Sequence, residues 1–121
     1  MAYTTINKSS DFFNIKLYTG NGGTQSITGV GFKPDLVWGK SRSGILYHIL
    51  SDVVRGPTKR IFSNDVSAEE TSANTITSFD SDGFSIGSNA DINGNSQTQV
   101  AWNWLAGGSH CLLYTSPSPR D

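Results

Sequence analysis

His48 is the residue best suited to proton transfer, because the other of the two histidines, His110, lies close to the C-terminus. A Ser-His-Asp triad would need Asp35 or Asp52 to orient the imidazole, and a serine to attack the substrate. No serine lies in a sequence that resembles a nucleophile elbow, the sharp turn that exposes a catalytic serine. We therefore interpret His48, within the apolar run 45–54, as a packed and hydrogen-bonded side chain.

The acidic residues offer a poor pair for cleaving a glycosidic bond. Glu69 and Glu70 are adjacent, so on a strand their side chains would point in opposite directions. Catalytic carboxyls must instead flank one bond, roughly 5–10 Å apart. The other candidates fall mostly at expected turns, where such side chains accept hydrogen bonds from backbone amides. These are Asp35, Asp52, Asp80 and Asp82. The sequence therefore predicts that the chain is not an enzyme.

Two short motifs resemble ligand-binding loops but lack essential parts. Residues 39–41 (Gly-Lys-Ser) end like a phosphate-binding loop, yet Pro34 stands where the first glycine of that motif is needed. Residues 89–94 resemble the first half of a calcium loop, yet Val100 stands where a bidentate glutamate is needed. The only cysteine is Cys111, which excludes a disulfide framework. We expect a polar hairpin loop at 89–95, and neither a cofactor nor a metal.

Tryptophans and planar polar side chains are the candidates for contacting a ligand. Trp38 shares a strand face with Leu36, and Trp102 shares one with Val100. We expect both tryptophans in the core, because a tryptophan buries a large apolar area. Trp104 lies nearer the end of its strand and is expected to be exposed. Sugar hydroxyls favour planar polar groups beside an aromatic ring, so the predicted ligand-binding residues are Arg42, His48, Asp52, Arg55 and Trp104.

Composition limits the kinds of protein to which the chain can belong. It has 121 residues, enough for one small domain, and a formal net charge of −1. So neutral a balance argues against a dedicated nucleic-acid binder, which needs clustered positive charge. No apolar run approaches the length of a membrane span. Residues 1–8 lack the apolar core of a signal peptide, so we expect any role outside a cell to use another route of release.

Alternating apolar and polar residues predict short strands along the whole chain. Phe13, Ile15 and Leu17 alternate with polar residues, which predicts a strand with one buried face. Residues 97–104 show the clearest alternation. Further strands are predicted at 25–30, 35–40, 59–63, 75–79 and 84–87, with a hairpin turn at 80–83. Many short strands at close spacing indicate an all-β fold, an antiparallel β-sandwich or jelly roll.

Two segments are ambiguous between helix and strand. Residues 45–54 fit both spacings, but bounding glycines and β-branched side chains favour a strand that is buried on both faces. Residues 67–70 could begin a helical turn, because Ser67 can cap a helix and Glu70 follows three residues later. That turn lacks an apolar run with which to continue.

The C-terminal segment does not read as natural protein. Residues 111–121 correspond, codon by codon, to a translated transposase-type sequencing adapter. Such segments are excluded from reasoning about the fold. We therefore predict a single β-sandwich domain at 1–110, truncated at its C-terminus, from an open reading frame of metagenomic origin. The adapter-derived tail at 111–121 is expected to be disordered.

Six sequence blocks, taken in order, resemble a family of virion-associated proteins from tailed bacteriophages, especially marine ones. The blocks are residues 18–22 (YTGNG), 27–32 (ITGVGF), 34–38 (PDLVW), 51–56 (SDVVRG), 78–84 (SFDSDGF) and 100–104 (VAWNW). The resemblance covers residues 1–110. It departs from the family at Gly39, where a bulky strand residue is expected, and at Leu105, where a lysine is common. It implies a concanavalin A-like lectin/glucanase jelly roll.

This resemblance implies a structural or recognition role without enzymatic turnover. We expect a virion structural or tail-fibre-associated module, made in the host cytoplasm and carried in the extracellular particle. Its expected partners are other virion proteins or a host-surface glycan. Association into homo-oligomers is left open. We expect neither nucleic-acid binding nor insertion into a membrane. An alternative is a carbohydrate-binding module of a secreted bacterial protein. A glycan-cleaving enzyme on the same fold is disfavoured by the positions of the aspartates.

Overall fold

The computed structural model describes residues 12–106. The segments 1–11 and 107–121, and with them His110 and the adapter-like tail, lie outside the described residues. The described part is almost entirely β, as predicted. Its elements are β1 (Phe13–Thr19), β2 (Gln25–Ile27), β3 (Leu36–Ser41), β4 (Ile49–Asp52), β5 (Lys59–Phe62), β6 (Glu70–Thr71), β7 (Ile76–Asp80), β8 (Gly83–Ile86), α1 (Ala90–Asn93) and β9 (Thr98–Trp104).

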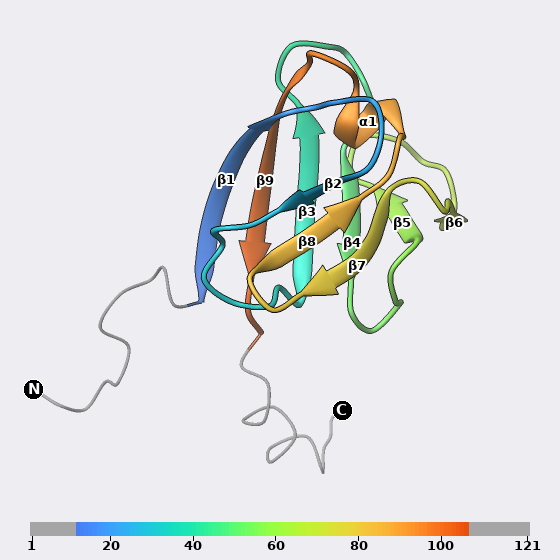
Figure 1. The fold of residues 1–121 in the computed structure, drawn as a ribbon. Coiled ribbons are helices and arrows are strands. Elements are labelled where there is room, and N and C mark those ends of the chain that lie inside the picture. The colour runs from blue at the N-terminus through green and yellow to red at the C-terminus, as the bar shows by residue number, and fades with distance from the viewer. Residues whose placement is uncertain (1–11, 107–121) are drawn as a thin grey trace, which may run out of the picture.

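Two antiparallel sheets form a sandwich (Figure 1), which confirms the predicted fold class. The larger sheet has six strands in the order β1-β9-β3-β4-β5-β6, and the smaller has three in the order β2-β8-β7. Strand β9 lies between β1 and β3, so the first and last described strands are neighbours. Within residues 12–106, no helix is long and apolar enough to cross a membrane.

The hydrophobic core lies between the two sheets. Val37 of β3 and Ala101 of β9 pack in one cluster with Phe84 of the smaller sheet and Ile92 of α1. Gly39 is the residue that lets α1 approach the large sheet. A Cβ atom there would lie 2.9 Å from the Cδ1 atom of Ile92. This contact explains why a glycine replaces the bulky strand residue that the resemblance led us to expect.

Most of the predicted strands are confirmed in position. The hairpin at 80–83 is confirmed, with Asp80 opposite Gly83 at the turn between β7 and β8. The strand predicted at 25–30 is shorter, since β2 ends at Ile27. The strands predicted at 35–40 and 59–63 correspond to β3 and β5 within one residue at each end. Local alternation and turn residues were therefore sufficient to locate these elements.

The segment 45–54 was predicted wrongly as one strand buried on both faces. Only Ile49–Asp52 forms a strand, and Ile45 and Val54 are 103% and 93% exposed. His48 precedes the strand and is half-buried. Its backbone N–H donates to the side chain of Asn64 at 2.8 Å. The apolar residues at both ends of the segment lie in connecting loops, which periodicity alone cannot distinguish from strand.

The structure decides one alternative that the sequence left open and corrects one further prediction. Residues 67–70 begin no helix, because Glu70 instead starts the short edge strand β6. The polar loop expected at 89–95 contains the helical turn α1, whose N-cap is Asn89. The side chain of Asn89 accepts a hydrogen bond from the backbone of Asp91 at 2.8 Å. Capping by asparagine is a common way to begin a helix, but too few residues follow to give a periodic pattern.

Candidate interaction surface

The face of the six-stranded sheet that points away from the smaller sheet carries the large apolar side chains. Val37 and Ala101 point into the core, and neighbouring side chains on a strand point to opposite faces. Trp38 and Trp102 therefore lie on the outer face. We call this outer side of the six-stranded sheet the aromatic face. The prediction that these two tryptophans belong to the core between the sheets is therefore wrong.

In β1, too, the apolar residues lie on the outer face of the sheet and not on the covered one. Its apolar residues were predicted to form its buried face, but Ile15 and Leu17 are 47% and 57% exposed. The neighbouring residue Tyr18 packs against the core instead. Alternation correctly groups the residues that share a face, but the same pattern does not indicate which face a second layer will cover.

One row of aligned residues crosses five strands of the aromatic face. Residues opposite each other in neighbouring strands lie on the same side of a sheet. In this row Trp102 is opposite both Ile15 and Trp38, and Leu50 is opposite both Trp38 and Ile61. Every member of this central row is apolar. Together the five residues form a continuous apolar band from β1 to β5.

A row on each side of the central row extends the apolar surface. The first contains Phe13, Trp104, Leu36 and Asp52, and the second contains Leu17, Val100 and Lys40. Each of these rows therefore has one charged residue, at the side of the sheet that is remote from β1. Ile15 and Leu17 are 47% and 57% exposed, the tryptophans of the three rows are partly exposed, and Val100 is 7% exposed. A contiguous apolar surface of this kind typically marks an interaction site.

The rings on the aromatic face contact one another in pairs. The ring centroids of Trp38 and Trp102 lie 4.9 Å apart, and those of Phe13 and Trp104 lie 5.1 Å apart. All three tryptophans of the chain are thus on this face. The indole N–H of Trp38 donates to the hydroxyl of Ser63 at 3.1 Å. The polar atom of this ring is therefore already bonded, and its apolar surface remains for a partner.

The covered face of the same sheet is the more polar one. Gln99 and Asn103, on the same strand as Trp102, are fully buried. The amide nitrogen of Asn103 donates to backbone oxygens of Asn14 and Ala101 at 3.1 and 3.2 Å. This distribution is the reverse of the usual one, in which polar side chains of a sheet face water.

An ion-pair cluster lies at one corner of the aromatic face. The guanidinium of Arg55 bonds Asp52 at 3.2 Å and also contacts Glu69. The backbone N–H of Arg55 donates to the Asp52 carboxylate at 2.7 Å. All three side chains are more than a quarter exposed, so the pairs add little stability. Both carboxylates are thus bonded to one arginine.

The five ligand-binding residues predicted from the sequence do not form one site. Asp52 and Arg55 are in contact, and Asp52 belongs to the same sheet row as Trp104. Arg42 lies just beyond the opposite end of β3, where its backbone N–H donates to Thr98. His48 is in the loop before β4. The prediction missed the central row, for which the alternation around Trp38 and Trp102 was the available signal.

The remaining acidic residues have structural roles in turns. Asp82 accepts hydrogen bonds from the backbone of Gly29 at 2.9 Å and Gly31 at 2.7 Å, as expected for an aspartate in a turn. These bonds hold the pKa of Asp82 below its usual range. Asp80 accepts from the hydroxyls of Ser78 and Ser85. Within residues 12–106, no group of three or more His, Cys, Asp or Glu could hold a metal.

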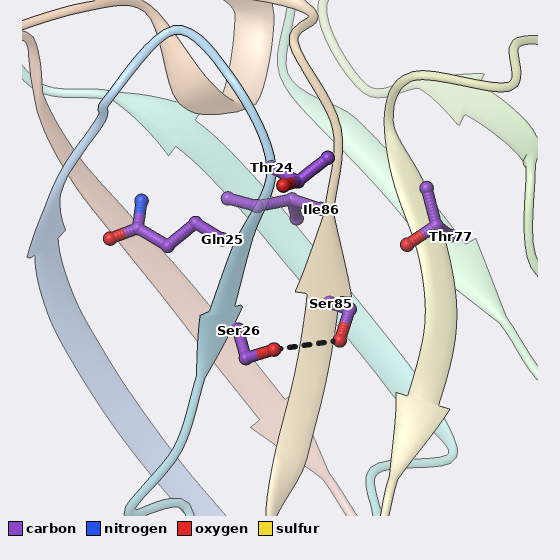
Figure 2. A pocket seen from close by; sticks show the side chains of 6 residues that line it. All are labelled: Thr24, Gln25, Ser26, Thr77, Ser85 and Ile86. Atoms are coloured by element: carbon purple, nitrogen blue, oxygen red, sulfur yellow. Dashed lines mark hydrogen bonds between the residues drawn. The ribbon is translucent and has the colours of Figure 1, made fainter.

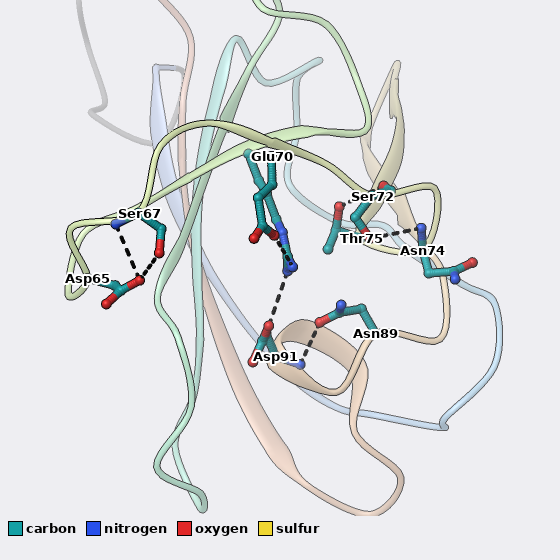
Figure 3. Close-up of polar contacts among 9 residues, drawn as sticks. Asp65, Ser67, Glu70, Ser72, Asn74, Thr75, Asn89 and Asp91 are labelled. Atoms are coloured by element: carbon teal, nitrogen blue, oxygen red, sulfur yellow. Dashed lines mark hydrogen bonds and ion pairs between the residues drawn. The ribbon is translucent and has the colours of Figure 1, made fainter.

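A buried cation links α1 to the edge of the large sheet (Figure 3). Arg60 of β5 is 8% exposed and bonds Asp91 at 3.1 Å and Glu70 at 2.8 Å. Figure 3 shows Glu70 and Asp91 on different segments, directed toward each other. These contacts join β5, β6 and α1, so their role is to stabilise the fold.

The outer face of the smaller sheet contains a shallow polar depression (Figure 2). Its volume is about 270 Å³, and the hydroxyls of Ser26 and Ser85 meet in it at 3.2 Å. Its lining residues are Thr24, Gln25, Ser26, Thr77, Ser85 and Ile86. A small-molecule site typically combines an enclosing apolar lining with a few polar groups. The depression has no charged or aromatic side chain, so the aromatic face is the stronger candidate.

Residues 8–112 match the family described as "Domain of unknown function (DUF7483)", and the chain belongs to this family. No curated protein matches the chain significantly, and neither does any solved structure.

Proposed function

We propose that this member of the family is a non-enzymatic interaction module of a phage virion protein, in a tail fibre or tail-associated chain. Its function would be to hold neighbouring virion chains through the aromatic face. The observation that carries this proposal is the central row, five aligned apolar residues across five strands. The order of the sequence blocks supports the phage context and the jelly-roll assignment.

The chemistry of the aromatic face favours a protein partner over a glycan. Interface cores between proteins are enriched in aromatic residues and depleted of charge. The central row has this composition. A sugar site needs several polar groups beside its aromatic ring, and the Trp38 indole N–H is already bonded to Ser63. Host-glycan recognition and a carbohydrate-binding module of a secreted bacterial protein are the alternatives that this argument ranks lower.

The lack of turnover is the second part of the proposal. The two carboxylates beside the aromatic face are both held by Arg55. Glycoside hydrolysis requires one carboxyl to donate a proton and another to act as a base or nucleophile. Neither Asp52 nor Glu69 is free for such a role in this arrangement.

Genomic context and a binding assay test this proposal together. We expect longer genes that encode this domain to lie beside tail genes; a consistent location in bacterial metabolic operons would contradict the virion assignment. The purified chain should neither bind nor cleave bacterial capsular polysaccharide or lipopolysaccharide, measured by calorimetry and by release of reducing ends. Hydrolysis that is abolished by Asp52→Asn would show that an enzyme had been missed.

A further inference from the structure

The partner of the aromatic face can be specified more closely from its shape, area and charges. As an extension of the proposed function, we infer that this face binds a second copy of the same chain. The two copies pack sheet against sheet around a two-fold axis that runs along the central row. The supporting observations are the sheet geometry, the area of the face and the positions of Lys40 and Asp52.

The shape of the aromatic face suits another sheet. Packed sheets lie about 10 Å apart, with mean strand directions within about 30° of each other because each sheet is twisted. A second copy presents a sheet with the same twist. The central row contains no charged residue, and the indole N–H of Trp38 already donates to Ser63. Apolar contact can therefore supply most of this interface, and the indole N–H of Trp102, in the same row, is the polar group that the partner or water has to satisfy.

The area is sufficient for a modest dimer. The central row spans about 19 Å, because neighbouring strands lie about 4.8 Å apart, and the three rows extend about 14 Å along the strands. Allowing for side-chain width, two copies would bury on the order of 1,000 Å², near the lower limit for specific interfaces. We therefore expect an association that can be reversed by dilution.

The charges select the orientation of the axis. Asp52 belongs to the row on one side of the central row, and Lys40 belongs to the row on the other side. An axis along the central row places each of these rows opposite the other row of the second copy. Lys40 then faces, one strand away, the partner's cluster of Asp52, Arg55 and Glu69, which has two carboxylates and one guanidinium and so a formal charge of −1. An axis parallel to the strands would instead place each row opposite the same row of the second copy. Lys40 would then share a row with the partner's Lys40, and Asp52 with the partner's Asp52.

Sedimentation of the full chain over a range of concentrations tests the association. We expect a monomer–dimer equilibrium that Ile15→Lys weakens at least tenfold, because this change places a charge in the central row. Ile45→Lys is the matched control, since Ile45 is an exposed loop residue outside the three rows. It should leave the dimer unchanged. A chain that stays monomeric throughout, or equal effects of the two substitutions, would overturn the inference.

Cross-linking tests the axis independently. On an axis along the central row, each residue near the middle of that row faces its own counterpart. In a Cys111→Ser background, Leu50→Cys should therefore form a cross-linked dimer with a short bis-maleimide, while Ile45→Cys should not. Efficient linkage at Ile45→Cys, or none at Leu50→Cys in a sample shown to be dimeric, would refute this orientation. Trimers in sedimentation would refute it as well.

The outcomes also separate this inference from the function on which it rests. If the chain is monomeric and Ile15→Lys abolishes binding to a polysaccharide, then a glycan occupies the aromatic face and self-association is refuted. Virion membership would still be decided by gene context. If the chain dimerises as described but its genes lie in metabolic operons, the dimer stands and the virion assignment fails.

Discussion

Replacing Asn93 with alanine should cost this small domain a large part of its stability. Asn93 is fully buried at the end of α1. Its amide nitrogen donates to the carbonyl oxygens of Gly23 and Gly87 at 2.7 and 2.9 Å. Its amide oxygen accepts from the backbone of Asn21 at 3.0 Å and from the side chain of Gln25 at 2.9 Å. One side chain thus ties α1 to the loop before β2 and to the end of β8.

The expected loss follows from these bonds. Each typical hydrogen bond contributes about 1 kcal/mol net, and a buried partner left unsatisfied costs about 1–3 kcal/mol. We expect Asn93→Ala to lower the free energy of unfolding by about 3–5 kcal/mol. A domain of this size loses about 4–8 °C in melting temperature per kcal/mol. The melting temperature should therefore fall by at least roughly 12 °C.

Urea and thermal unfolding, followed by circular dichroism, measure this loss. Asn93→Asp is a stricter test, because it keeps the acceptor oxygen but faces a carboxylate toward the oxygens of Gly23 and Gly87. It should not restore stability. Asn95→Ala, at an exposed position in the loop that follows α1, should change stability by less than about 0.5 kcal/mol. A loss below about 1 kcal/mol for Asn93→Ala would refute the assigned role.

Three further substitutions or titrations follow from the buried and bonded groups. Arg60→Ala should cost about 3 kcal/mol of unfolding free energy, since it removes a buried cation and leaves the largely covered Asp91, 14% exposed, unpaired. Arg55→Ala at the exposed cluster should cost less than about 1 kcal/mol, and chemical denaturation compares the two. Burial raises the pKa of Tyr18, so the folded chain keeps this phenol neutral and stability should fall as the pH rises above about 10, the usual pKa of tyrosine. Ultraviolet absorbance should show Tyr18 ionising only on unfolding. Asp82→Asn should lower stability at neutral pH, because the lowered pKa of Asp82 contributes stability above its unfolded value of 3.8. That difference should vanish in urea titrations as the pH falls through and below the lowered pKa. An unchanged gap there would contradict the role of the carboxylate charge.

The sequence was informative about strands and about which residues share a face. Val100 and Trp102 lie on one face, as their spacing requires. The sequence could not identify which face of the sheet is covered, because a period of two defines two faces without indicating which one packs against a second layer. That choice depends on Gly39 and Ala101, whose small size admits Ile92 and the second sheet. Those contacts join segments that are far apart in the chain, and no local pattern encodes them.

The candidate site divides in the same way between local and distant contacts. Asp52 and Arg55 are three residues apart and meet in one turn, so their pairing was accessible from the sequence. Trp38 and Trp102 meet only because β9 pairs with β3. Their separation along the chain hides the central row until the strand order is known.

Acrylamide quenching of tryptophan fluorescence tests the central claim most directly, because Trp38, Trp102 and Trp104 all lie on the aromatic face. The experiment uses the folded Ile15→Lys chain at low concentration, where it is expected to be monomeric. We predict red-shifted emission that acrylamide quenches readily, with blue-shifted and protected emission in the unsubstituted chain at high concentration. Blue-shifted, protected emission from the monomer would place the indoles in the core and contradict this account.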